Sequence, residues 1–247
     1  MSERGKLQRY VEIATEVRSL ASDIVDAVAR KLQAENPSLS FRDRVLVGLA
    51  LKMYNAFEAL VEDARQGRAA AVHHLKTLVE TLIYFHWVGQ GPGEARAKLV
   101  FAMAPYRKLV FFKENPGYAG DAEYEAWEAG LREITHGLER EWEEFRKHNL
   151  DRLAEQTGQD VAQWYDRVYR LACEPAHIAD LLEHMPLREG PIRLGETQTG
   201  RLWASIGLDY GLCIILDLLR AASDGYQLGF DERIGEVQAR YNAIRAK

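Results

Sequence analysis

The 247-residue chain has few of the features that would indicate a secreted, zinc-binding or dedicated nucleic-acid-binding protein. Its only two cysteines, Cys173 and Cys213, are too few for a disulfide framework, and no CxxC pair indicates a zinc site. Lys and Arg number 32 against 37 Asp and Glu, so the formal net charge is −5. Nucleic-acid-binding proteins normally carry a basic excess instead. These absences predict a reduced, cytoplasmic protein.

The sequence also shows no signal-peptide pattern in its first residues and no long uninterrupted apolar run. Its first residues, MSERGKLQRYVEIATEV, do not have the basic, apolar and small-residue order of a signal peptide. The most apolar stretch, 202–219, is interrupted by Asp209 and Asp217. A membrane-spanning helix needs about 20 residues with few charges, so we expect a buried core helix here and no membrane contact.

Helical periodicity dominates the rest of the sequence. Apolar residues recur at three- and four-residue spacings, and the strict alternation of half-buried strands is missing. The pattern predicts an all-α fold with a single bundle of about eight helices, forming one domain over residues 1–247. A homodimer through the long or apolar helices is compatible with this pattern. The predicted helices span 4–35, 41–66, 68–89, 93–114, 121–156, a sixth from 159 that Pro175 interrupts, 200–222 and 231–245.

Several residues mark where these helices begin and end. Asn36-Pro37 ends the first helix, because a residue before proline is pushed out of the helical region. Ser40 is expected to cap the second, with Asp43 reaching back to it. Residues 185–199 hold two prolines and two glycines without a helical stripe, and are therefore predicted to form an irregular loop, the best candidate for a lid.

Two stretches carry residues with functional potential. Glu80 lies in a mostly apolar helix, where a carboxylate must be paired or protonated, and Lys76 one turn away is the expected partner. This pair is either a structural salt bridge or the anchor of a site between helices. The second stretch places Tyr169, Arg170 and His177 around the proline-broken turn, where irregular geometry re-aims side chains.

Together these stretches resemble a family of bacterial helical proteins known only as a domain of unknown function. One helix of that family carries Arg-x-x-x-Glu, and a later one carries Tyr-Arg-x-x-Ser-x-x-x-His. The matching residues here are Glu80, Tyr169, Arg170 and His177, while Lys76 replaces the arginine and Cys173 the serine. The lysine keeps the charge but loses the planar fork that grips a carboxylate or phosphate. The resemblance covers about residues 65–185 and implies a helical fold with a Glu–Lys–Tyr–His cluster.

A broader resemblance is to the HEPN ribonucleases, helical proteins whose signature is an arginine followed four to six residues later by a histidine. Arg170 and His177 have six residues between them, and Arg68 and His73 have four. The resemblance implies metal-independent cleavage, in which His177 is general acid or base for a ribose 2′-hydroxyl and Arg170 holds the phosphate. RNA is a partner only under this alternative, and the acidic net charge counts against it.

A third interpretation comes from spacing. Two ExxH pairs place a carboxylate and an imidazole on one face of a turn, as di-iron and di-manganese bundles do, with single glutamates from two other helices. The candidate ligands are Glu58, Glu80, Glu133, His136, Glu174 and His177.

The leading interpretation is a regulatory or interaction module without a cofactor, with a polar pocket between helices. Lys76, Glu80 and Tyr169 are its expected binding residues. The metal-independent ribonuclease using Arg170 and His177, and the di-metal bundle, remain the alternatives.

Overall fold

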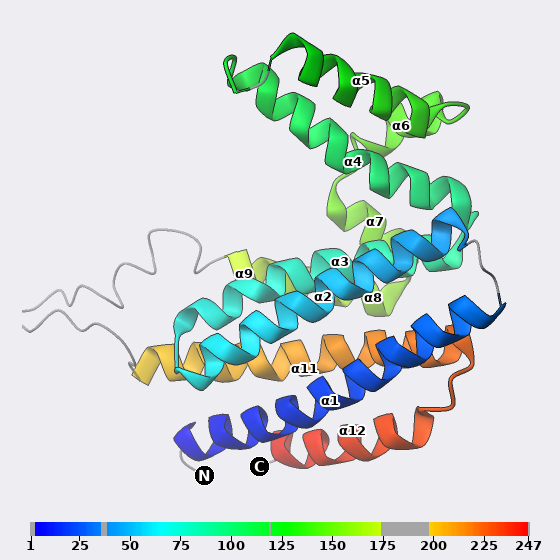
Figure 1. Ribbon diagram of the computed structural model, residues 1–247. Helices are drawn as coiled ribbons and strands as arrows, with labels where there is room; N and C mark the ends of the chain where they lie inside the picture. Colours follow the sequence, from blue (N-terminus) through cyan, green and yellow to red (C-terminus); the bar gives the residue numbers. More distant parts are fainter. Residues whose placement is uncertain (1–2, 36–38, 119, 174–197, 247) are drawn as a thin grey trace, which may run out of the picture.

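The computed structural model describes residues 3–35, 39–118, 120–173 and 198–246, and its elements within these ranges are all helices. The predicted all-α class is therefore confirmed. The bundle is built from α1 (Glu3–Glu35), α2 (Phe41–Arg65), the short 3-10 helix η1 (Ala69–Val72), α3 (His73–Gln90), α11 (Gln198–Tyr226) and α12 (Asp231–Arg245). In Figure 1, α1 and α12 cover one side of α11, α2 and α3 cover the other, and the two ends of the chain lie close together.

Helix α11 forms the centre of this bundle, as the apolar stretch predicted. It packs against α1, α2, α3, η1 and α12, and Leu208 and Leu212 are fully buried. Within the described residues it is the one helix long and apolar enough to span a membrane by length and composition, but 61% of its most apolar window is buried inside the fold. That burial is typical of a core helix.

Two glycines allow α11 to approach its neighbours closely. A Cβ atom on Gly207 would lie 3.3 Å from the backbone of Ala71 in η1. A Cβ atom on Gly211 would lie 2.8 Å from the side chain of Leu60 in α2. A larger residue at Gly207 would press on the backbone of η1, whereas one at Gly211 would require the end of the Leu60 side chain to shift.

Helices α4 (Gly93–Glu114), α5 (Asp121–Thr135) and α6 (Glu139–Phe145) form an arm that projects from the bundle at the top of Figure 1. The single helix predicted over 121–156 is wrong, because this stretch holds α5, α6 and α7 (Leu150–Thr157). Gly137 separates the first two with a φ of 77°, and Asn149 adopts an extended conformation before the third. Glycine takes positive φ without a steric penalty, so the chain turns there despite a continuing apolar pattern.

Other boundaries agree more closely with the sequence. The predicted helices 93–114 and 231–245 are found with those bounds, and Ser40 caps α2 by accepting from the amide of Asp43 at 3.1 Å. The Ser40 hydroxyl also donates to the Asp43 carboxylate at 2.6 Å. Helix α11 continues through Gly225 to Tyr226, so the predicted end at 222 is wrong, and Gln227 follows it at a φ of 51°. Pro175 and the predicted loop up to residue 197 lie outside the described residues.

A largely apolar pocket of about 550 Å³ lies where α1, α2 and α11 meet. Aliphatic side chains form most of its walls, and Tyr54 and Tyr226 supply its polar side-chain atoms. It is separate from the polar groups described below.

Candidate functional site

The chain between α7 and residue 173 forms an irregular helix that packs against α3. It comprises α8 (Gln159–Trp164), the π-helical turn η2 (Tyr165–Tyr169) and α9 (Arg170–Cys173). A π-turn inserts one extra residue into a helix and is frequent at functional sites. Here the rings of Tyr165 and Tyr169 stack with centroids 5.0 Å apart and planes 17° apart.

Each of these two tyrosine rings has a cation beside it. Lys76 reaches over from α3, and its Nζ atom lies 5.7 Å from the centroid of the Tyr169 ring. The guanidinium of Arg170 lies 5.8 Å from the centroid of the Tyr165 ring. Both distances are within the range of a cation–π attraction. We call Lys76, Tyr165, Tyr169 and Arg170 the tyrosine–cation surface.

Glu80 lies close to this surface but has a different partner from the predicted one. Its side chain is 18% exposed, and its carboxylate pairs with Arg107 of α4 at 3.4 Å. Lys76 is instead directed to Tyr169. No local pattern in the sequence indicates Arg107, because it lies on another helix, 27 residues away from Glu80 along the chain.

Tyr169 stays protonated at neutral pH. Burial, followed by the nearby Cys173 and Glu80, raises the pKa of Tyr169 from 10.0 to about 12. The phenol therefore acts as a hydrogen-bond donor and not as a base. Arg170, whose side chain is 68% exposed, pairs with Asp166 at 3.5 Å and leaves most of its guanidinium open to solvent.

The structure thus brings Lys76, Glu80 and Tyr169 to one region, with Arg170 at its edge. His177 and Glu174 lie outside the described residues. Their contact with this region stays a prediction. In the other predicted Arg–His pair, Arg68 is engaged by Asp63 at 3.3 Å, and His73 is the first residue of α3.

The described members of the di-metal set are dispersed. Glu58 pairs with Arg18 of α1, while Glu133 and His136 lie at the end of α5 in the arm. In the part of the chain that the structure describes, no three His, Cys, Asp or Glu side chains gather in a group that could hold a metal ion.

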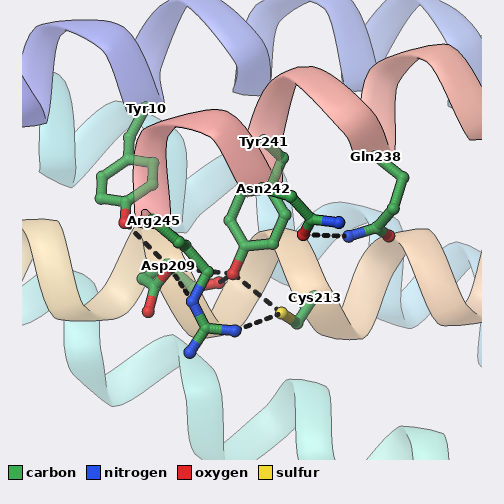
Figure 2. Close-up of polar contacts among 7 residues, drawn as sticks. All are labelled: Tyr10, Asp209, Cys213, Gln238, Tyr241, Asn242 and Arg245. Atoms are coloured by element: carbon green, nitrogen blue, oxygen red, sulfur yellow. Dashed lines mark hydrogen bonds and ion pairs between the residues drawn. The ribbon is translucent and has the colours of Figure 1, made fainter. Parts of the chain in front are cut away.

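A second polar cluster, which the sequence analysis missed, joins α1, α11 and α12 (Figure 2). The hydroxyls of Tyr10 and Tyr241 donate to the same oxygen of Asp209 at 2.9 and 2.8 Å. Arg245 pairs with this oxygen at 3.3 Å, and the Cys213 Sγ atom lies 2.8 Å from the Tyr241 hydroxyl. Burial, followed by the contact with Cys213, raises the pKa of Tyr241, so its hydroxyl remains a donor.

A polar pocket of about 430 Å³ opens beside this cluster. Three helical stripes form its walls: one on α8 and the π-turn, one on α11 and one on α12. Its lining residues are Asp160, Gln163, Trp164, Arg167, Val168, Tyr210, Cys213, Asp217, Arg220, Gln238 and Arg245. The sequence predicts a polar pocket between helices, but one lined by Lys76, Glu80 and Tyr169.

Comparison with known proteins places the chain in a family. Its residues 43–188 match the model of the Family of unknown function (DUF5677). The chain belongs to this family. No curated protein and no solved structure matches it. The matched range contains the tyrosine–cation surface and the α8 and π-turn wall of the polar pocket, whereas α1, α11 and α12 lie beyond it. The resemblance to a helical family of unknown function is therefore confirmed.

Proposed function

We propose that the protein is a binding module that recognises single-stranded RNA at the tyrosine–cation surface without cleaving it. One observation carries this proposal: two stacked tyrosine rings each have a cation beside them. Proteins that bind unpaired nucleotides combine aromatic rings, on which bases stack, with cations that contact the phosphates. The proposal concerns a local surface and is compatible with a net charge of −5 for the whole chain.

The described groups of this surface also supply no general base for cleavage. Tyr169, with its pKa raised to about 12, does not accept a proton at neutral pH. Lys76 and Arg170 supply charge and no general base. Among the described residues of this surface, the chemistry supports binding.

The two cysteines, Cys173 and Cys213, are free thiols, which supports a reducing, cytoplasmic location.

The test is the affinity of the full-length protein for a short fluorescent single-stranded RNA, measured by anisotropy. Replacing Tyr169 by Leu should weaken binding about tenfold, because stacking on one base contributes about 1–3 kcal/mol. Lys76→Ala and Arg170→Ala should weaken binding and reduce its salt dependence.

Arg132 of α5 provides a matched control, because it is also exposed and pairs with an acidic residue four positions away, Glu128. The Arg132→Ala variant should bind RNA as the wild type does. If the wild type does not bind RNA at low salt, or if the three surface variants bind as tightly as it does, the proposal is wrong.

Metal-independent cleavage is the second candidate, favoured by the exposure of Arg170 at the position that the HEPN resemblance assigns to the phosphate. The same RNA is incubated with chelator and examined for fragments. Cleavage that Arg170→Ala and His177→Ala both abolish, with an unchanged helical spectrum, would replace the binding proposal by the ribonuclease. Activity that needs added iron or manganese, and is as sensitive to Glu133 and His136 as to Glu174 and His177, would indicate the di-metal alternative.

A further inference from the structure

The polar pocket is lined by other side chains of α8 and the π-turn than those of the tyrosine–cation surface, and it has its own set of charged groups. The side chains of α11 that line it, Tyr210, Cys213, Asp217 and Arg220, follow one another at spacings of three and four residues. They form a polar stripe along a helix whose other faces are buried. The wall from α8 and the π-turn repeats this pattern from Asp160 to Val168. A polar hollow between three packed helices results.

Positive charge exceeds negative charge around this hollow. Its lining holds the guanidiniums of Arg167, Arg220 and Arg245 and the carboxylates of Asp160 and Asp217. This local excess contrasts with the net charge of −5 of the whole chain.

The contacts that these charged groups make show which of them remain available to a ligand. Arg245 is engaged by Asp209 at 3.3 Å, and Asp217 lies 3.5 Å from the Nε2 atom of His86. Arg167 and Arg220 have no carboxylate partner within the part of the chain that the structure describes. They come from two different helical segments that line the same pocket, which offers two guanidiniums to one ligand. Guanidinium groups bind phosphate oxygens through paired hydrogen bonds.

The remaining walls favour a ligand with a flat apolar part. Trp164 of α8 and Tyr210 of α11 both line the pocket, and Gln163 and Gln238 add amide groups. A volume of about 430 Å³ falls within the range of small-molecule sites. Two aromatic side chains among these polar groups offer an apolar surface to part of a ligand.

We infer that this pocket binds a small phosphomonoester that carries a flat ring. The guanidiniums of Arg167 and Arg220 hold its phosphate, and Trp164 and Tyr210 contact its ring. This site is distinct from the tyrosine–cation surface and does not depend on RNA binding there. The site joins a wall within the matched range, from α8 and the π-turn, to two walls outside it, from α11 and α12.

The test is calorimetric titration of the full-length protein with phenyl phosphate and with inorganic phosphate, at constant ionic strength. Phenyl phosphate should bind saturably and more tightly than inorganic phosphate. Arg167→Gln and Arg220→Gln should each weaken both ligands about tenfold or more, because a hydrogen bond to a charged group contributes about 1.5–3 kcal/mol. Trp164→Leu should weaken phenyl phosphate and leave inorganic phosphate unchanged.

Arg9 supplies the matched control, because it is an exposed arginine on α1 that does not line the pocket. Arg9→Gln should bind phenyl phosphate as the wild type does, and so should Lys76→Ala, which tests the tyrosine–cation surface alone. Helical spectra of all variants establish that they fold. The inference is overturned if phenyl phosphate does not bind at millimolar concentration, if benzoate binds equally well, or if Arg167→Gln and Arg220→Gln retain wild-type affinity.

Discussion

At the scale of single residues, Asp209 has the largest number of polar partners in the central helix. It accepts hydrogen bonds from Tyr10 and Tyr241 and pairs with Arg245, so it connects α11 to the first and last helices (Figure 2). Tyr10 is 1% exposed and Tyr241 is fully buried. Water therefore cannot replace the carboxylate as the acceptor for Tyr10 without a rearrangement.

We predict that Asp209→Ala lowers the free energy of unfolding by about 2–3 kcal/mol, because it leaves the buried Tyr10 hydroxyl without its acceptor. Tyr241 loses less, since it also donates to the backbone oxygen of Asp209 at 2.9 Å. Urea unfolding followed by circular dichroism measures the change. The control Asp26→Ala, at an exposed position of α1, should change stability by less than about 0.5 kcal/mol.

A double variant separates this cause from a general effect of removing a carboxylate. Tyr10→Phe should cost less in the Asp209→Ala background than in the wild type, because both partners of one hydrogen bond are then absent. Additive costs in the two backgrounds would show that Tyr10 and Asp209 do not interact energetically.

The sequence predicted some of these residues and missed others for physical reasons. The apolar neighbourhood of Glu80 and a family-like motif were enough to predict that Lys76, Glu80 and Tyr169 lie near one another. Arg107 could not be predicted as the partner of Glu80, because it comes from another helix and its own surroundings are ordinary. Asp209 was visible as a charge in the most apolar stretch, but its partners depend on how α1 and α12 pack on α11.

At the scale of helices, the π-turn sets the direction of the side chains on either side of it. Tyr165 and Tyr169 stack beside Lys76 of α3, while Arg167 and Val168 line the polar pocket next to α11. Because of the extra residue in the turn, one short helix contributes side chains both to the contact with Lys76 of α3 and to the wall of the polar pocket. A regular α-helix would rotate everything after the turn by about 100°.

We predict that deleting Asp166, an exposed residue inside this turn, converts the turn to a regular α-helix and separates Tyr169 and Arg170 from Lys76. The deletion variant should keep its helical spectrum, unfold at a lower temperature, and bind RNA no more tightly than Tyr169→Leu does. The Asp166→Ala variant keeps the number of residues and serves as the control, with little change in either measurement. Wild-type RNA affinity in the deletion variant would show that the π-turn does not position the tyrosine–cation surface.

Helix boundaries show which local signals are sufficient. Gly91-Pro92-Gly93 acts through backbone geometry and Ser40 through a side-chain hydrogen bond, and the helix boundaries beside them were predicted closely. Gly137 acts through the same geometry, but it stands alone in a periodic apolar pattern that continues through α6 and α7. The apolar pattern alone therefore predicted one helix where the structure has three. Pro105 shows that a local signal can also be without effect, because α4 continues through this proline instead of ending at it.

At the scale of the whole molecule, the bundle and the arm differ in how much of each helix is buried. Helix α11 is covered on several sides. Most of its residues from Leu208 to Leu219 are buried, and a few are partly exposed. In α5, Thr135 is the one buried residue among the described side chains, and the helix packs mainly on α4. Helix α5 of the arm is thus held by far less apolar burial than α11.

This difference predicts two levels of amide hydrogen exchange, measured by mass spectrometry of peptides. Amides in the middle of α11 should exchange only when the bundle unfolds, because opening them exposes the shared core. Amides of α5 should exchange at least about tenfold faster, through local opening of the arm. In Asp209→Ala, exchange should accelerate together in α1, α11 and α12, since Asp209 joins these helices, while exchange in α5 stays unchanged. Equal protection of α5 and α11 in the wild type would mean that the arm unfolds with the bundle as one cooperative unit.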